Sequence, residues 1–377
     1  MCDLLHLHLS ASGHRIHVTR SRAILGRRSR YRAPALNARL PDILDLMAAP
    51  EVGVLVQTVG VAGRPGSFVH TEGDEDEAAS RRTTIEPGGW LRATAEHRGV
   101  TLDDLGASPS QEVIVLRDAR IGTETMGRPL DYEDTPTTQL FRRQMNDINT
   151  WLEEVEVVFD EEVFAEGTRR AVDHTDRRLR RIFSQGRFDS GGRLFGGFWQ
   201  RLKKAERRHG LFIDGNPTVE LDYGQIVPRI VYGRRGLVPP AGDLYAIPGF
   251  EDYRSGIKKM LNAALFATRP LTRFPRGVGE AFGRHHRVAD VVEAIKTAHP
   301  AIADTFFSGV GHHAQFLESE ILVGVLLRLR ELGIHALPIH DAIVIPATSV
   351  TTASEVMLSV FREAAGAPGL VSVEGCV

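Results

Sequence analysis

The chain has 377 residues, 42% hydrophobic and 25% charged, so it can bury one large core or two to three modest ones. Its formal net charge of −2 excludes a uniformly basic nucleic-acid-binding protein, but charge is segregated, with acidic residues at 153–162 and basic ones at 177–187 and 201–208. No apolar run is long enough to cross a bilayer, the N-terminal pattern is not that of a signal peptide, and the two cysteines suit no disulfide framework. We therefore expect a cytoplasmic protein without a membrane partner.

Residues 1–105 carry no motif with a recognisable chemistry, and we assign them to a small N-terminal accessory domain of unknown role. The segment 4–18 alternates apolar and polar residues, which predicts one or two strands, and 42–48 has helical spacing. Neither pattern indicates a partner.

Residues 106–190 are predicted to form a strand followed by a helical connector. The strand is expected at 112–121, and the pattern turns helical from about 139 to about 184. An apolar stripe on the first helix is followed by a strongly basic helix at 176–183, DRRLRRIF. Two such helices could grip a duplex backbone or act as scaffold.

Residues 191–377 are predicted to alternate short strands with longer helices. Two apolar runs joined by DGNP at 214–217 predict a hairpin, and 334–346 predicts a second pair of strands. Helices are expected at 253–267, 312–332 and 352–365. The aromatic residues Phe195, Phe198 and Trp199 could stack on bases or pack in the core.

Two short segments each place an aspartate beside a β-rich apolar run: Asp222 in LDYGQIVPR at 221–229 and Asp341 in LPIHDAIVIP at 337–346. Carboxylates that project from neighbouring strands can hold two divalent metal ions, which serve an in-line phosphoryl transfer. We expect both aspartates to bind two magnesium ions, for which manganese could substitute, with the backbone carbonyl of Tyr223 as a further ligand. The pair predicts a nucleotidyl-transfer site.

Between the two aspartates, the predicted helix 253–267 repeats polar and aromatic side chains every four residues. Arg254, Lys258, Asn262 and Phe266 share one face of it. We expect Arg254 and Lys258 to bind a triphosphate, with Lys258 also catalytic, and the other two to meet the sugar and base. A solvated basic stripe is the plainer explanation of this spacing alone, but its place between the aspartates favours the functional one.

The three motifs, in this order, resemble those of the family A polymerases, which include bacterial DNA polymerase I and the single-subunit phage and mitochondrial RNA polymerases. Residues 222–229, DYGQIVPR, are similar to their motif A, which reads DYSQIELR in DNA polymerase I. Arg254, Lys258 and Phe266 match motif B, and His340 with Asp341 matches motif C. The resemblance covers roughly residues 190–377, about half of the chain.

This resemblance implies an α+β right-hand polymerase fold. Its antiparallel palm sheet would carry both aspartates, and helical fingers would carry Arg254 and Lys258, so that residues 191–377 form the catalytic region. The helices of 106–190 would form a reduced thumb, and 1–105 a small N-terminal domain. No exonuclease motif is present there, which implies synthesis without proofreading.

The resemblance also implies contacts with a primer–template. Gln315 is similar to the glutamine that opens the helix before motif C. Arg193 lies in a Gly-Arg segment similar to one whose arginine approaches the primer–template, and His340 would lie at the primer end. With Arg229 of motif A, these residues form the expected nucleic-acid-binding set.

The residues expected beside the incoming nucleotide differ from both branches of the family. Val227 stands where the DNA enzymes have glutamate and the phage RNA polymerases glycine. Phe266 replaces the usual tyrosine, and Ala342 follows the motif C aspartate in place of glutamate or serine. Together with Gln225, Val227 is expected to contact the nucleotide, and the DYxQI spelling favours deoxynucleotides.

We therefore expect a magnesium-dependent nucleotidyltransferase that extends a 3′-hydroxyl of a primer–template with nucleoside triphosphates, with DNA-directed DNA synthesis favoured. A DNA-directed RNA polymerase or primase, an inactive polymerase-like nucleic-acid-binding module and a two-metal nuclease are the alternatives. The sequence leaves open the sugar, the template type, the primer requirement, the pathway, the oligomeric state and any protein partner.

Overall fold

The computed structural model divides the chain into two compact units, each described here by itself: unit 1 is Met1–Glu112 with Phe164–Thr175, and unit 2 is Val113–Val163 with Asp176–Val377. No helix among the described residues is long and apolar enough to cross a membrane. The structure describes residues 1–10, 15–60, 83–105, 111–119, 127–164, 172–283 and 286–374.

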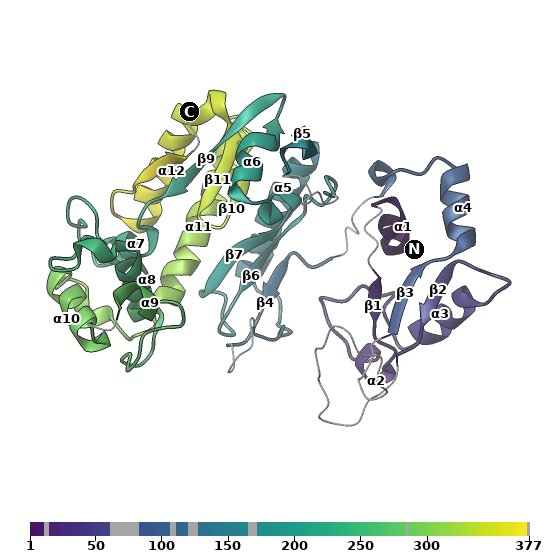
Figure 1. Cartoon of the computed structure of the whole chain (residues 1–377), viewed down its shortest axis with the longest axis horizontal. Helices are drawn as coiled ribbons and strands as arrows, with labels where there is room; N and C mark the ends of the chain where they lie inside the picture. Colours follow the sequence, from purple (N-terminus) through teal and green to yellow (C-terminus); the bar gives the residue numbers. More distant parts are fainter. Residues whose placement is uncertain are drawn as a thin grey trace. The chain divides into compact units, whose positions relative to one another are not determined.

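Unit 1 is a small α+β unit built on a three-stranded antiparallel sheet (Figure 1). The strand order is β1-β3-β2, and one apolar cluster contains Leu4, Leu44, Leu55, Ile85 and Leu91. The elements in chain order are α1 (Cys2–Leu9), β1 (Ile16–Val18), α2 (Arg22–Leu25), α3 (Leu40–Ala48), β2 (Leu55–Thr58), β3 (Thr83–Pro87), α4 (Gly89–His97) and the 3₁₀ turn η1 (Leu102–Asp104).

The structure corrects the expectation of strands at the start of the chain. Residues Cys2–Leu9 form a helix, and the only strand found at 4–18 among the described residues is Ile16–Val18. The apolar positions of the first segment fit either period. Leu4 is buried and Leu5 packs beside it in the core of unit 1, so neighbouring rather than alternating residues face inward.

The larger sheet of unit 2 is antiparallel and carries both aspartate motifs. Its order is β10-β11-β9-β8-β5, and β12 also pairs with β9. Asp214 and Gly215, with φ of +50° and +72°, form the two-residue turn between β8 and β9, as their sequence predicts. The strands are β5 (Val157–Phe159), β8 (Leu211–Ile213), β9 (Asn216–Tyr223), β10 (Leu337–Ile339), β11 (Ala342–Pro346) and β12 (Val371–Glu374).

The second sheet of unit 2 contains β4 (Ile114–Leu116), β6 (Leu179–Phe183) and β7 (Gly191–Gly196), with β4 and β6 parallel. Helix α5 (Pro136–Glu154) packs against β4 and β6. The basic helix expected at 176–183 is wrong, because its second half is strand β6. Leu179, Arg181 and Phe183 are buried in alternation, so a buried arginine completes a two-residue period.

Helix α11 is the central helix of unit 2. It packs against β7, α5, α7, α8 and α12, and each of residues 310–329 is buried or half-buried, as expected for a helix covered all round. The helices of this unit after α5 are α6 (Lys204–Gly210), α7 (Ile226–Arg234), α8 (Arg254–Phe266), α9 (Gly279–Phe282), α10 (Val288–Ala298), α11 (Val310–Glu331) and α12 (Val350–Ala365).

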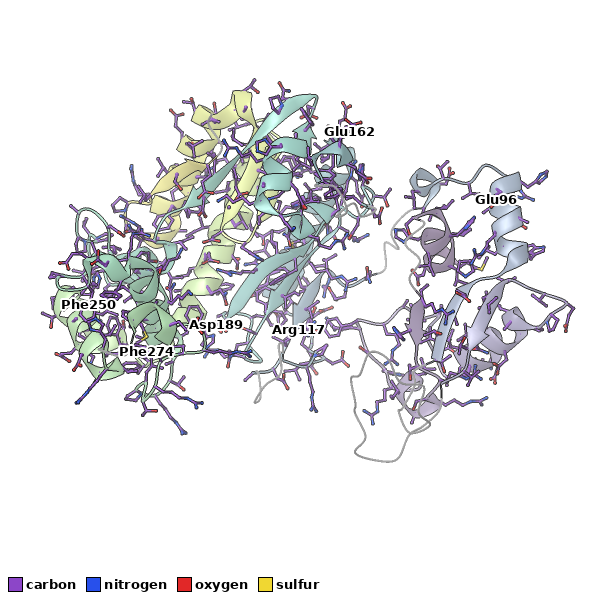
Figure 2. The ribbon with its side chains drawn as sticks, viewed as in Figure 1. Glu96, Arg117, Glu162, Asp189, Phe250 and Phe274 are labelled. Atoms are coloured by element: carbon purple, nitrogen blue, oxygen red, sulfur yellow. The ribbon has the colours of Figure 1, made fainter. Side chains whose placement is uncertain are left out.

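An aromatic cluster joins α8 to α9, near the labelled Phe250 and Phe274 in Figure 2. The ring of Phe282 stacks on Phe274 with centroids 5.2 Å apart and on Tyr253 at 5.6 Å. Gly256 of α8 faces the same ring, and a β-carbon there would lie 2.7 Å from it. The cluster therefore fixes α8 from the side that does not carry Lys258.

Candidate active site

The structure brings the two predicted aspartates together. Asp222 lies near the end of β9, directly opposite Ala342 in the antiparallel register of β9 and β11. Asp341 immediately precedes Ala342, and its backbone oxygen accepts a hydrogen bond from the N–H of Tyr223 at 3.4 Å. Asp222 on β9 and Asp341 in the turn that leads into the paired strand β11 are thus neighbours, as two metal ligands require.

A strained turn presents Asp341. His340 and Asp341 form the two-residue link between β10 and β11, and His340 has a φ of +56°. A turn with positive φ only at its first central residue normally takes glycine there, and a β-carbon in this conformation costs free energy. The His340 ring lies 5.8 Å from that of Phe195, edge to face. Motif C is therefore held in a conformation that its residue types alone disfavour.

The electrostatic field at Asp222 is that of a carboxylate in need of a cation. Burial, together with the negative charges of Asp341 and Glu220, raises the pKa of Asp222 to about 6, while Lys258 and Lys204 act in the opposite direction. A divalent ion bound by the two aspartates would relieve this repulsion.

Glu318 of α11 is a third carboxylate of this field, and it is not among the site residues expected from the sequence. It is 1% exposed; its Oε1 accepts a hydrogen bond from Nε of Arg193 at 2.6 Å, whereas Oε2 has no partner within the described part of the chain. Burial, with a smaller contribution from the charges of Asp341 and Asp222, raises the pKa of Glu318 to about 7, although Arg193 acts in the opposite direction. The sequence signal was available, since Glu318 lies four residues from the buried Ala314 and Leu322 on one helix face.

Arg193 of β7 links this carboxylate to an open cavity of about 360 Å³. The negative charges of Glu318 and Asp341 both raise the pKa of its guanidinium, against the effect of burial. The predicted residues Arg193, Gln315 and Phe266 therefore line one cavity, together with Arg117, Asp118, Gly127, Ile182, Phe183, Ser184, Gln185, Gly191, Phe195 and His312.

The two cations of α8 have different surroundings. Lys258 is exposed and, among the described residues, makes no hydrogen bond or ion pair, but its charge acts on Asp222. Arg254 is instead paired with Asp243 and lies with its guanidinium carbon 5.5 Å from the ring centre of Tyr245. Lys258 is thus available to an anion, whereas Arg254 must first exchange Asp243 for one.

The lower half of the same helix face is only partly exposed. Oδ1 of Asn262 is buried and has no hydrogen-bond partner in the described structure. The Phe266 ring meets His312 edge to face at 5.1 Å, and it lies so close to Gly311 that a β-carbon there would be 2.5 Å away. The predicted sugar and base contacts therefore lie at the α8–α11 junction.

The remaining motif A residues are buried. Gln225 adopts a left-handed conformation with φ of +58°, and its amide binds Asp243 and Arg229. Arg229 is 8% exposed and also donates to the backbone oxygen of Pro368, and Val227 is 7% exposed. In this structure the side chains of Gln225 and Arg229 bind other residues of the protein and are not free to bind a ligand. Asp243 accepts hydrogen bonds from both Gln225 and Arg254.

The aromatic residues near β7 divide between the two roles expected of them. Trp199 and Phe198 are 0% and 1% exposed, and the indole N–H donates to the backbone oxygen of Pro338 at 3.0 Å. They are core residues. Phe195 alone of the three is exposed, beside His340.

The donor set fits magnesium only in combination with a substrate. The described residues contain no group of three or more His, Cys, Asp or Glu side chains arranged to hold a metal ion. Two oxygen-donor carboxylates leave most positions of an octahedral ion to water and phosphate, which is the usual protein environment of magnesium in phosphoryl transfer. The Tyr223 side chain does not compete, since its hydroxyl donates to the Met357 oxygen at 2.6 Å.

No protein-family model and no curated protein matches the chain. Among solved structures, it is similar to the POL domain of Pol1 from M. smegmatis in complex with a DNA primer-template and dNTP. The sequence identity is 13%, the TM-score is 0.30, and the match covers 63% of this chain and 50% of that one. The chain thus matches half the length of that domain, and this weak likeness carries no functional argument here.

Proposed function

We propose that unit 2 is a compact, family A-like nucleic-acid polymerase that extends a 3′-hydroxyl by a two-metal mechanism. The observation that carries this proposal is the placement of Asp222 near the end of β9 beside Asp341, which immediately precedes the paired strand β11, with the unpaired ammonium of Lys258 acting on the Asp222 carboxylate. In this proposal the β10-β11-β9-β8-β5 sheet is the palm, the α8 region the fingers and α5 a reduced thumb. Residues 106–190 connect to the catalytic region 191–377, and 1–105 are accessory.

Two magnesium ions held by Asp222, Asp341 and the Tyr223 carbonyl would supply activation of the attacking hydroxyl and stabilisation of the leaving pyrophosphate. Lys258 would neutralise the triphosphate and promote its departure. Arg254 would join it after leaving Asp243, an exchange that frees Asp243 to hold Gln225 alone. Positioning and charge neutralisation would provide most of the rate enhancement.

The incoming nucleotide would lie along the exposed face of α8. Phe266 would meet the base, and the unpartnered Oδ1 of Asn262 would accept a hydrogen bond from the sugar or base. Val227 and Gln225 would shape the sugar side. Because Val227 offers no hydrogen-bonding group, discrimination between sugars would rest on shape.

The nucleic acid would pass over the cavity lined by Arg193 and Gln315. Arg193 would leave or share Glu318 to reach the strand, and His340 would lie at the primer end. Because the guanidinium of Arg229 is buried, Arg229 would not touch the nucleic acid; it would position Gln225, to which it donates a hydrogen bond. We favour a DNA primer–template and deoxynucleotides, and retain a DNA-directed RNA polymerase or primase as the alternative.

The test is a primer-extension assay with deoxynucleotides or ribonucleotides, in magnesium or EDTA. We expect incorporation by the wild type in magnesium only, and a loss of at least about a thousandfold in Asp341→Ala and in Asp222→Ala. Asp304→Ala is the matched control, because Asp304 is exposed and paired only with Arg235. Incorporation by a folded Asp341→Ala variant at the control rate would refute the proposal, and strand cleavage without triphosphates would indicate a nuclease.

A further inference from the structure

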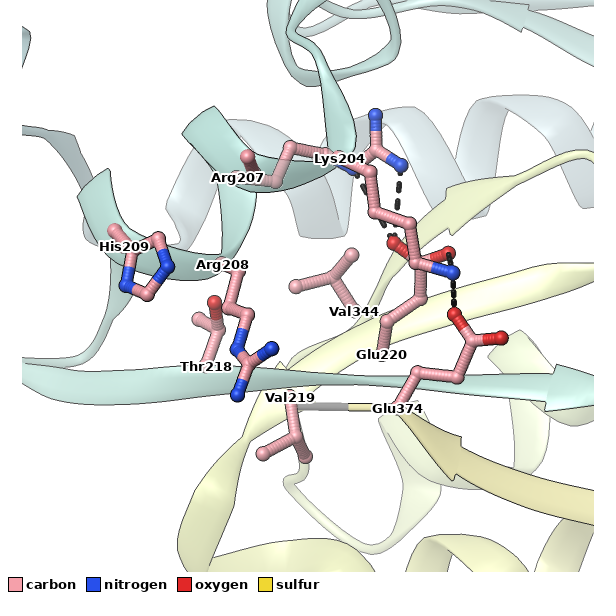
Figure 3. A pocket seen from close by; sticks show the side chains of 10 residues that line it. Lys204, Arg207, Arg208, His209, Thr218, Val219, Glu220, Val344 and Glu374 are labelled. Carbon is pink, nitrogen blue, oxygen red and sulfur yellow. Dashed lines mark hydrogen bonds and ion pairs between the residues drawn. The ribbon is translucent and has the colours of Figure 1, made fainter. Parts of the chain in front are cut away.

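A second cavity of unit 2 lies between α6 and β9, with a volume of about 470 Å³ (Figure 3). None of the residues assigned to catalysis lines it. Its walls combine four basic side chains of one short helix with residues of β9, β11 and β12. The lining residues are Lys204, Ala205, Arg207, Arg208, His209, Thr218, Val219, Glu220, Val344 and Glu374.

The charges of this cavity do not cancel. Arg207 pairs with Glu220 at 3.0 Å, and Lys204 pairs with Glu374, as the dashed lines in Figure 3 mark. Both carboxylates of the cavity are thereby neutralised. Arg208 and His209 are exposed, and neither makes a hydrogen bond or ion pair within the described residues. One guanidinium and one imidazole therefore remain available to an anion.

The cavity and the candidate active site both include residues of β9, since Thr218, Val219 and Glu220 line the cavity and Asp222 lies further along the same strand. Thr218, Glu220 and Asp222 alternate on one face of the strand. At about 3.3 Å per residue, Asp222 lies about 7 Å from Glu220 and about 13 Å from Thr218. The charges of Glu220 and Lys204 act on the Asp222 carboxylate, which confirms that the two sites share one electrostatic field.

We propose that Arg208 and His209 bind phosphate groups on the 5′ side of the 3′-hydroxyl that is extended at Asp222 and Asp341. This inference rests on the proposed polymerase function. Each strand of a duplex carries one phosphate per about 3.4 Å of axis, so for a duplex whose axis runs along β9 a span of about 7–13 Å corresponds to the phosphates two to four residues upstream. The pre-paired Lys204 and Arg207 hold the cavity walls, while the two unpaired groups meet the ligand.

The same chemistry has two sources: the backbone of a primer strand, or the triphosphate of an initiating nucleotide in synthesis without a primer. The primer strand is the source we favour, since none of the α8 residues proposed to hold the incoming nucleotide lines this cavity. The two are separated by comparing primed with unprimed synthesis.

The experiment uses the full chain and primers of three to ten nucleotides, each with a 5′-phosphate or a 5′-hydroxyl. For the wild type, we expect the 5′-phosphate to lower the KM of the primer by about two- to fivefold, and only for the shortest primers. Arg208→Ala/His209→Ala should lose this preference yet extend long primers at nearly the wild-type kcat. Its salt dependence of binding, as the slope of log K against log salt, should fall by about one per lost phosphate contact.

Two controls accompany the double variant. Arg330→Ala removes an exposed arginine of α11 that does not line the cavity, and it should keep the preference. Arg208→Lys keeps the positive charge, so its slope of log K against log salt should lie between those of the wild type and the double variant. Thermal melts establish that each variant is folded.

Loss of the 5′-phosphate preference in the double variant alone supports the primer strand as the ligand. Selective loss of unprimed synthesis supports the triphosphate of an initiating nucleotide. If the double variant matches the wild type in preference, unprimed synthesis and salt slope, the phosphate site is refuted while extension of long primers still upholds the polymerase. If the wild type extends no primer at all, the proposed function fails, and this inference fails with it.

Discussion

The two units differ in where they keep their charges. In unit 1, the pairs Arg22–Asp42 and Arg20–Asp45 lie at the surface, with at least one member of each more than half exposed. In unit 2, Arg181 is 0% exposed and the side chain of Glu318 is equally buried. Surface pairs contribute little to stability, whereas a buried charge costs several kcal/mol unless it is fully compensated.

This difference indicates that the buried charges of unit 2 are not explained by stability alone. Of the buried charges of unit 2, Arg181 lies on β6 and Glu318 on α11, and the charges of both aspartates act on Glu318. Arg181 binds Glu320, Ser319 and the backbone of Gly192, and its guanidinium stacks 4.6 Å from the ring of Phe141. A unit that needed only a core would be more stable with apolar residues at these positions.

The largest effect on stability is expected from Glu320→Ala. The substitution leaves the Arg181 guanidinium buried without its counter-charge, so the free energy of unfolding should fall by about 3–5 kcal/mol. Glu363→Ala, which removes the exposed partner of Arg328 in the same unit, should have little effect. Both are measured by urea unfolding of the full chain. Equal losses would show that burial does not separate the two kinds of pair, and Glu320→Ala/Arg181→Met should recover most of the loss.

A smaller, pH-dependent effect is expected from Glu318→Gln. Since the pKa of Glu318 rises to about 7 in the fold, the stability associated with its protonated form is present below its usual pKa and is lost as the pH rises towards and past 7. In EDTA, glutamine should therefore stabilise the fold at pH 8, by on the order of 3 kcal/mol, and the difference should shrink steadily as the pH falls from 7 to 5. Thermal melts from pH 5 to 8 measure it, with the exposed Glu355→Gln as control. A difference independent of pH would contradict the expectation.

The smallest effect is expected in unit 1, from Asp45→Ala. Hydrogen bonds from Arg20 and Gln57 lower the pKa of Asp45 to about 2, but the group is exposed to solvent, which screens its interactions. The unfolding transition at pH 7 should therefore be unchanged within error. A shift as large as that of Glu320→Ala would remove the contrast between the units.

The parts of the site that follow local rules could be predicted from the sequence. Asp214-Gly215 specifies a two-residue turn, which sets the register of β9 and so the position of Asp222. The helical period of 253–267 gave the shared face of Lys258 and Asn262. These features depend only on neighbours in the chain.

The features that depend on distant partners were beyond sequence reasoning. The sequence of 176–183 predicts a basic helix, whereas Arg181 is buried in strand β6. Its guanidinium is stabilised there by Glu320, Ser319 and the ring of Phe141, which are distant in the chain. The pairing of Arg254 with Asp243 and the left-handed conformation of His340 likewise have no local signature. Tertiary contacts decided each of them.

The division of the chain also has a practical consequence for separating the units. The chain crosses between them three times, because Phe164–Thr175 belongs to unit 1 although its flanking segments belong to unit 2. Within unit 1, His6 forms a 2.6 Å contact with Asp173, so removal of residues 1–112 would strip this segment of its partners. Isolation of unit 2 would therefore require a linker in place of 164–175, not a single cut.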